Sequence, residues 1–446
     1  MGCIVSSALA PDLTPPSRTP NDWQALYSSL KKIPRRCINP YTNLYAEGAS
    51  RLGWDVEIMS RSKSVILCHP KGRGPSSCPV LVRRHKVDVL CNNQVAKIFK
   101  SKFETQKQLM QIGVPCPQTF YVHASDGIPI LRLKPGQGGP YVVKPVQGSQ
   151  GKGVHMGLQN KKEVLEALKD IWSSRKVPCL VQEQVEGSDY RILLLRGKLL
   201  EVIQRIPAYV TGDGVSSTEE LIEHDNKRRK ACDLPLLVKV PSLGPFNDVP
   251  PAGTRRTIQD KANVSLGGEP LRYPLDRIHR TNISLFMKMA EQFKEQPMLG
   301  IDFLGDLAVP WRRRPPKQGA STRPRYSGVI LELNSSPQMF CHTLRRNTFN
   351  LGIIQKILME ASIEARIKQV SIENRKSSSK RRKSSRRRIG SGSKSSGMGS
   401  SNSVSTKNTT ATTTFDISNA SRPKSRSGGS GNISRPKSRS SSGSLL

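Results

Sequence analysis

The 446-residue sequence is poor in acidic residues and has no long apolar run. Only 34 Asp and Glu stand against 71 Lys and Arg, which gives a formal net charge of +37. No stretch approaches the roughly 18 uninterrupted apolar residues of a membrane-spanning helix. The composition also excludes a collagen-like, a disulfide-stapled or a wholly disordered chain. We therefore expect a globular protein whose length allows two or three domains.

The nine cysteines form no CxxC pair and follow no spacing pattern. An odd, scattered set without a secretory signal predicts reduced thiols in a cytosolic compartment, and it argues against a zinc site. These cysteines are Cys3, Cys37, Cys68, Cys78, Cys91, Cys116, Cys179, Cys232 and Cys341.

The stretch 371–446 differs in composition from the rest of the chain. It holds 17 Lys or Arg and two acids, has almost no aromatic residues, and contains SRPKSRS twice. Such a segment cannot bury enough apolar surface to offset the entropy of ordering, so we expect a disordered basic tail. The basic run over 380–388 could bind anionic lipid, act as a nuclear-localisation or nucleic-acid patch, or only keep the protein in solution.

The chain begins with a pattern typical of N-terminal acylation. Gly2 with Ser6 four residues later fits N-myristoylation, and Cys3 is a candidate for palmitoylation. A single myristoyl chain anchors only marginally, so Cys3 or the basic tail would have to supply the second attachment to an anionic membrane. The alternative is that so short a match arises by chance. We expect a cytoplasmic protein, which acylation would attach to the inner face of a membrane.

Four regions follow one another along the chain. We expect an acylatable, Pro-rich and ill-ordered leader over 1–37, a small α/β lobe over 38–95, a larger domain over 96–370, and the tail over 371–446. Apolar spacing predicts an α+β fold with largely antiparallel sheets and helices on one side. The predicted strands are 54–58, 64–67, 141–145, 154–158, 179–182, 190–195, 199–206, 298–303 and 328–333. The predicted helices are 45–52, 101–112, 161–172, 217–231, 276–295 and 350–368.

A glycine-rich loop, GSQGKG at 148–153, lies between two predicted strands. A P-loop requires Ser or Thr directly after its Lys, but Gly153 follows Lys152, so this is no P-loop, and GxGxxG is absent too. Two interpretations remain: a flap whose backbone N–H groups close over phosphates, or a merely mobile hairpin. Lys144 ends the strand directly before this loop, and Lys102 opens an earlier helix. Both could neutralise phosphate charge.

Three polar residues interrupt two otherwise apolar strands. Asp302 lies in LGIDF at 299–303, and Glu332 and Asn334 lie in VILELN at 329–334, where a period of two places both on one face. Two carboxylates and an amide oxygen suit Mg²⁺. The alternative is that these are ordinary exposed polar residues of a strand face.

Taken in order, these residues resemble the ATP-grasp superfamily, over about residues 90–345. The likeness is closest to the ATP-grasp region of cyanophycin synthetase and of bifunctional glutathione synthetases. It rests on Lys102 with Thr105 and Leu109, GVPCP at 113–117, VKP at 143–145, QEQVEGSDYR at 182–191, RIPA at 205–208, TGDG at 211–214 and ELNSSP at 332–337.

The resemblance implies two α+β lobes that clamp ATP, and it assigns roles to named residues. Those implied to contact the ATP phosphates or to cover them are Lys102, Lys144, Gly148, Ser149, Gly151 and Gly153. Those implied to hold adenine and ribose are Gln182, Glu183, Val185 and Asp189. Asp302, Glu332 and Asn334 would bind Mg²⁺, or Mn²⁺ in its place, and Arg191 and Arg205 would be the catalytic arginines at an acyl-phosphate site.

The sequence departs from the family pattern in three places. Gln182 stands where cyanophycin-type enzymes often have Glu, although Gln-Glu resembles the ribosomal-protein glutamate ligases. Gln338 replaces the Gly that usually follows Asn-x-x-Pro, which bears on the substrate loop more than on ATP binding. A basic, Pro-rich insertion at 310–326 separates the two metal strands, and a hairpin there would leave them undisturbed.

The resemblance implies an ATP- and Mg²⁺-dependent carboxylate–amine ligase that acts on an amino acid or peptide through an acyl phosphate. One alternative is an inactive ATP-grasp protein that serves as a membrane-tethered scaffold. Another is nucleic-acid binding through the +37 charge, which we do not favour because no aromatic residues interleave the basic run.

Overall fold

The computed structural model describes residues 18–390 except 73–76, 124–139, 149–152, 241–242, 312, 315–324 and 346–347; of residues 20, 313, 314, 325 and 380–390 it describes the backbone alone. The chain divides into two units, 1–381 and 382–446, and every described strand belongs to the first. The acylation motif, Ser149, Gly151 and the chain beyond 390 lie outside the described residues.

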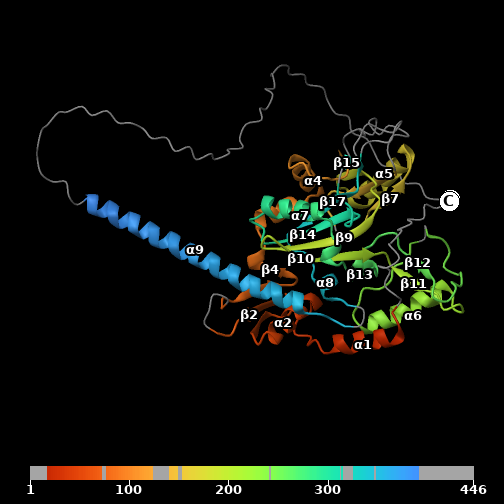
Figure 1. Ribbon diagram of the computed structural model, residues 1–446, viewed down its shortest axis with the longest axis horizontal. Coiled ribbons are helices and arrows are strands. Elements are labelled where there is room, and N and C mark those ends of the chain that lie inside the picture. The colour runs from red at the N-terminus through yellow and green to blue at the C-terminus, as the bar shows by residue number, and fades with distance from the viewer. Residues whose placement is uncertain are drawn as a thin grey trace, which may run out of the picture. The chain divides into compact units, whose positions relative to one another are not determined.

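A five-stranded antiparallel sheet forms the centre of the first unit (Figure 1). Its order is β13 (Glu269–Arg272), β10 (Lys198–Ile206), β9 (Ser188–Leu195), β14 (Met298–Gly305) and β17 (Gly328–Asn334). The helix α7 (Arg280–Gln292) covers one face, where Phe286 packs against Tyr190, Ile192 and Phe303 of the sheet. The predicted hairpin of β9 and β10 around Gly197 is confirmed.

A second antiparallel sheet carries the glycine loop. Its order is β5 (Thr119–Val122), β8 (Cys179–Glu183), β6 (Tyr141–Pro145) and β7 (His155–Leu158), and α5 (Lys161–Arg175) packs its apolar side onto it. The glycine loop connects β6 to β7. Before this sheet come α3 (Asn93–Lys100), which the sequence did not predict, and α4 (Lys102–Gln111), which Ser101 caps.

The N-terminal region forms a third sheet whose core is continuous with that of the central sheet. Its strands are β1 (Asp55–Ser60), β2 (Val65–His69), β3 (Val80–Arg83) and β4 (Lys86–Val87), with α2 (Pro40–Arg51) alongside. One apolar cluster joins these elements to Leu193 and Leu195 of β9, to Met298 of β14 and to the start of α9 (Gly352–Gly390). The second face of the central sheet is therefore partly covered by the N-terminal region (Figure 1).

A smaller module follows β10. It comprises β11 (Tyr209–Thr211), α6 (Thr218–Ala231) and β12 (Arg255–Thr257), and the predicted capping box of Ser217 with Glu220 starts α6. The insertion after β14 begins and ends in a paired hairpin, β15 (Arg313–Arg314) with β16 (Arg325–Tyr326), as expected. The short helix α8 (Phe340–Thr343) follows β17. Within the described part of the chain, no helix combines the length and the apolar character needed to cross a membrane.

The prediction of an ill-ordered leader over 1–37 is wrong for the helix α1 (Pro20–Lys31). Thr19 and Asp22 form a capping box, and Pro20 occupies the first helical turn, where its missing N–H costs nothing. Trp23 and Leu26, three residues apart, share a helix face and are buried in the core. The prolines that suggested disorder thus include one that begins a helix.

The prediction of a disordered tail from residue 371 is also wrong for 371–390, which belong to α9. The helix starts in the core, where Ile354, Ile357 and Leu358 are fully buried. Neither Gly nor Pro occurs between Gly352 and Gly390, and Lys and Arg are good helix formers, so nothing in the sequence ends the helix at 371.

Replacement of a core residue of α1 tests whether the helix belongs to the fold. We expect Leu26→Ala to lower the free energy of unfolding by about 2–5 kcal/mol, because Leu26 is fully buried and the truncation leaves a cavity. The exposed neighbour Gln24→Ala should stay within about 0.5 kcal/mol of the wild type. Urea unfolding measures both, and equal stability of the two variants would show that α1 does not pack.

Candidate active site

The three predicted metal ligands lie together on β14 and β17. Asp302 is directly opposite Glu332 in the antiparallel register, and Asn334 is opposite Gly300, two residues along. Residues that face each other across antiparallel strands share a face, with Cβ atoms about 4.5–5.5 Å apart. The structure therefore gathers the three side chains at one end of the central sheet.

The donor atoms at this position fit a magnesium ion. Carboxylate and amide oxygens are the hard ligands that Mg²⁺ prefers. The Asn334 amide nitrogen is buried and has no hydrogen-bond partner among the described residues, so no such bond through this nitrogen fixes the side chain. We conclude that Asp302, Glu332 and Asn334 could hold the ion, although their role as ligands stays a prediction.

Both predicted catalytic arginines contact Asp302. Arg191 of β9 donates from Nε to Asp302 Oδ1 at 2.5 Å and from a terminal nitrogen to Oδ2 at 3.2 Å. Arg205 of β10 lies 3.5 Å from Asp302 Oδ2 and also donates to Asp189, from Nε at 2.9 Å. Two arginines and two aspartates thus form one charge cluster, which is mostly buried.

The cluster shifts the pKa values of its members in opposite directions. Burial disfavours the charged form of Asp302, but Arg191 and Arg205 outweigh it and hold the pKa of this carboxyl below its usual value. For Asp189, burial dominates over Arg205, and the nearby Asp302 adds to it, so its pKa is raised. The arginines remain charged. The cluster therefore offers fixed positive charge beside the candidate metal ligands.

The two predicted phosphate lysines lie near these acids. Lys102 Nζ lies 3.4 Å from Glu332 Oε1 and donates to the Gly148 carbonyl at 2.8 Å, which links α4 to the glycine loop. Lys144 is buried; burial lowers the pKa of its ammonium, Glu332 and Asp302 oppose this, and Lys102 adds to it. A buried ammonium next to the loop is suited to an anionic ligand that would neutralise it.

The predicted adenine residues lie at the end of β8. Gln182 is buried and donates from Nε2 to Thr119 Oγ1 at 2.6 Å, Glu183 accepts from the backbone N–H of Gln118 at 3.0 Å, and Val185 follows the strand half-buried. Asp189, expected at the ribose, accepts a hydrogen bond from Arg205 within the charge cluster, and its contact with ribose stays a prediction.

The ends of the glycine loop have the backbone expected of a tight flap. Gly148 and Gly153 have positive φ angles of 151° and 74°, a conformation that favours glycine. A side chain at Gly153 would also meet the Arg175 guanidinium at 3.1 Å. Ser149 and Gly151 lie outside the described residues, so their predicted contact with phosphates stays a prediction.

The sequence did not predict a second buried network beside the cluster. His342 of α8 pairs through Nδ1 with Glu201 Oε2 at 2.8 Å, and Arg345 donates to Glu201 Oε1 at 2.9 Å. Burial would lower the pKa of His342, but Cys341 and Glu201 raise it to about 9. Burial would raise the pKa of the Cys341 thiol, yet His342, Arg191 and Arg205 lower it. The sequence does contain one indication of this network, because Glu201 is an acid within the otherwise largely apolar predicted strand 199–206.

Residues 117–215 match the family model of the prokaryotic glutathione synthetase ATP-grasp domain. The crystal structure of a bifunctional glutathione synthetase from Pasteurella multocida matches with a TM-score of 0.50, over 72% of this chain and 44% of that chain, at 19% identity. This chain has the ATP-grasp fold. The predicted fold class and the resemblance to the superfamily are thereby confirmed.

Curated relatives match about half of the chain. A cyanophycin synthetase from Geminocystis herdmanii is 29% identical in a match of 254 aligned positions that covers 53% of this chain and 27% of the relative. The glutathione biosynthesis bifunctional protein of Streptococcus agalactiae is 26% identical over 234 residues, 49% of this chain and 30% of the relative. The chain thus spans less than a third of the length of the curated relatives it matches.

The charge cluster predicts different structural roles for the two acidic candidate ligands. We expect Asp302→Asn to lower the free energy of unfolding by about 3 kcal/mol or more, because it leaves the buried Arg191 without its counter-ion. Glu332→Gln should cost at most about 1 kcal/mol, since that side chain is one-third exposed and, among the described residues, its ion pair is with Lys102. Urea unfolding without nucleotide measures both. A loss in Glu332→Gln as large as in Asp302→Asn would contradict the cluster.

Proposed function

We propose that this protein is an ATP- and Mg²⁺-dependent carboxylate–amine ligase. The observation that carries the proposal is the convergence, within an ATP-grasp fold, of two lysines, two arginines and three oxygen-bearing side chains at one end of the central sheet. In the reaction, ATP phosphorylates a substrate carboxylate, an amine attacks the acyl phosphate, and an amide, ADP and phosphate are released.

The chain's own charges suit this chemistry. Lys102 and Lys144 would stabilise negative charge as it moves onto the departing ADP. Arg191 and Arg205 would hold the acyl phosphate and the oxyanion that forms when the amine attacks. Mg²⁺ held by Asp302, Glu332 and Asn334 would neutralise phosphate oxygens and orient them. Because Asp302 and Asp189 already fix both guanidiniums, the arginines need little rearrangement for this role.

The substrates are proposed as a class. The curated relatives are enzymes of cyanophycin and glutathione synthesis, and this suggests an amino acid or peptide as the substrate of this protein. Gln338, at the start of the segment that leads to α8, stands where the family pattern has glycine, which favours an acceptor different from theirs. Attachment to an anionic membrane through Gly2, Cys3 and the basic tail stays a prediction.

The metal strand provides the direct test of activity. Purified full-length protein with ATP, Mg²⁺ and a pool of amino acids should release ADP, and mass spectrometry should detect an amide product. Glu332→Ala should reduce ADP release at least about 100-fold, since it removes a ligand that acts on the transferred phosphate. Glu291→Ala, an exposed acid on α7, is the matched control and should retain activity. Normal turnover by Glu332→Ala would refute the metal assignment.

Nucleotide binding can be tested apart from turnover. Mg²⁺–ATP should raise the melting temperature of the wild type, because a ligand that binds only the folded state stabilises it. Lys144→Met should abolish this shift without lowering the melting temperature of the nucleotide-free protein, since it removes a buried charge and keeps an apolar stem. Lys97→Met, at an exposed position of α3, should keep the full shift. A full shift in Lys144→Met would exclude Lys144 from the ATP site.

A further inference from the structure

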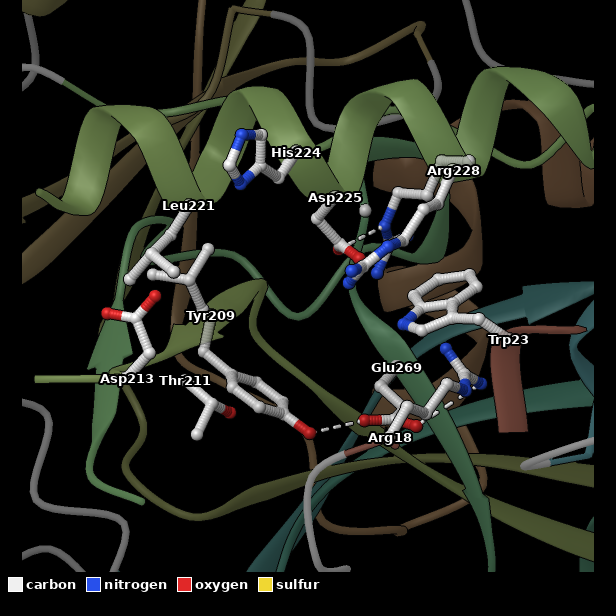
Figure 2. A pocket seen from close by; sticks show the side chains of 13 residues that line it. Arg18, Trp23, Tyr209, Thr211, Asp213, Leu221, His224, Asp225, Arg228 and Glu269 are labelled. Carbon is white, nitrogen blue, oxygen red and sulfur yellow. Dashed lines mark hydrogen bonds and ion pairs between the residues drawn. The ribbon is translucent and has the colours of Figure 1, made fainter. Parts of the chain in front are cut away.

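A cavity of about 260 Å³ lies between α6, β11 and the start of α1 (Figure 2). Its volume is just below the roughly 300 Å³ of the smallest pockets that hold drug-sized ligands, which suits an occupant of amino-acid size. The charged and aromatic residues of its wall include Arg18, Trp23, Asp213, Asp225, Arg228 and Glu269.

The acids that line this cavity already have partners. Glu269 accepts a hydrogen bond from the Tyr209 hydroxyl at 2.6 Å and pairs with Arg18 at 3.2 Å, and both side chains of this pair are buried. Asp225 pairs with Arg229 at 2.9 Å. Asp213 accepts hydrogen bonds within its own turn, from the backbone of the two residues after Gly214. None of these acids is a free binding site for a cationic ligand.

Two hydrogen-bond donors of the cavity wall have no partner among the described residues. The Arg228 side chain is exposed and makes no ion pair or hydrogen bond with any described residue, and Figure 2 shows it at the cavity beside Asp225. The Trp23 indole N–H faces the cavity (Figure 2) and likewise has no hydrogen-bond partner among the residues described. Its ring is held in place between the guanidinium groups of Arg18 at 5.0 Å and Arg229 at 5.7 Å. Free donors in a preformed cavity select an acceptor-rich ligand.

We propose that this cavity binds the carboxylate of an amino acid or short peptide, through the guanidinium of Arg228 and the indole N–H of Trp23. A planar guanidinium matches a carboxylate in a bidentate arrangement. The three arginines of the lining are balanced by three acids, so the wall has no net positive charge to attract a phosphate dianion over a carboxylate that carries its own ammonium group. The apolar part of the ligand would rest against Leu221 and Val210.

The sheet register places this cavity close to the arginine pair of the proposed active site. Glu269 of the cavity wall is opposite Ile206, and the next residue, Pro270, is opposite Arg205. Strand spacing and rise put the backbones of Glu269 and Arg205 roughly 6 Å apart, but successive residues of a strand alternate in face, so the two side chains leave the sheet on opposite faces. A substrate that used both sites would therefore pass around the edge strand β13. That role as a substrate site rests on the proposed ligase function, whereas the binding itself does not.

Tryptophan fluorescence without ATP tests the binding, because Trp23 lines the cavity. The probes are the twenty common L-amino acids and the dipeptide glycylglycine, each titrated singly, and then the carboxamide of any probe that binds. We expect a saturable change with at least one probe, and its carboxamide should bind at least about tenfold more weakly, as the charge-assisted hydrogen bonds are lost. Inorganic phosphate should produce no saturable change.

The variants Arg228→Ala and Lys230→Ala locate the site. Arg228→Ala should weaken the responding probe at least about tenfold, while Lys230→Ala, an exposed cation of α6 outside the cavity lining, should bind it normally. Both positions are exposed, so neither variant should change the melting temperature. No response to any probe, equal binding by the carboxamide or by phosphate, or undiminished binding by Arg228→Ala would overturn the proposal.

The ligase assay separates this proposal from the proposed function. If the wild type releases ADP, Arg228→Ala should raise the KM for the carboxylate-bearing substrate at least about tenfold and leave the KM for ATP unchanged. An unchanged KM would exclude the cavity as a substrate site. Absence of ADP release in the wild type, with carboxylate binding intact, would refute the ligase and leave the cavity as a carboxylate site.

Discussion

The ion pairs of Arg191 and Arg205 with Asp302 and Asp189 are the interaction on which the rest of the candidate site depends. They join three neighbouring strands of the central sheet, β10, β9 and β14, through side chains, in addition to the backbone hydrogen bonds between these strands. A buried charge is tolerated only when it is paired, so these four residues constrain one another's positions. The lysines and the remaining acids are arranged around this fixed centre.

Much of the fold follows from local patterns that are present in the sequence. The strand β6 has the predicted bounds, 141–145, because Tyr, two Val and the following Pro specify both its character and its end. The start of α6 follows from the spacing of Ser217 and Glu220. The leader shows the limit of such patterns: Pro20 looked like a breaker, but at the first turn it favours a helix, and the burial of Trp23 depends on contacts with distant parts of the chain.

Some features of the candidate site were also predictable from local sequence, and others were not. Alternation along two apolar strands was enough to select Asp302, Glu332 and Asn334, and the register brings them together. Local spacing could not predict the pairing of His342 with Glu201, or that of Arg18 with Glu269, because their partners are 141 and about 250 residues away in the sequence. The pairing of Asp189 with Arg205 was likewise not predicted, since a family motif gives the order of residues but not which neighbour a buried carboxylate contacts.

One face of the strand β9 contributes side chains both to the apolar core and to the ion-pair cluster. Leu193 and Leu195 are enclosed in the apolar core that the central sheet shares with the N-terminal region, whereas Asp189 and Arg191, at alternate positions of the same face, belong to the ion-pair cluster. A well-packed core resists sliding of the strand, because any shift would open voids among its side chains. Burial of Leu193, two residues along the strand, thus fixes the backbone that carries Arg191. The N-terminal region carries none of the proposed catalytic residues. By packing against β9 it accordingly keeps the end of the sheet that carries Asp189 and Arg191 in a fixed position.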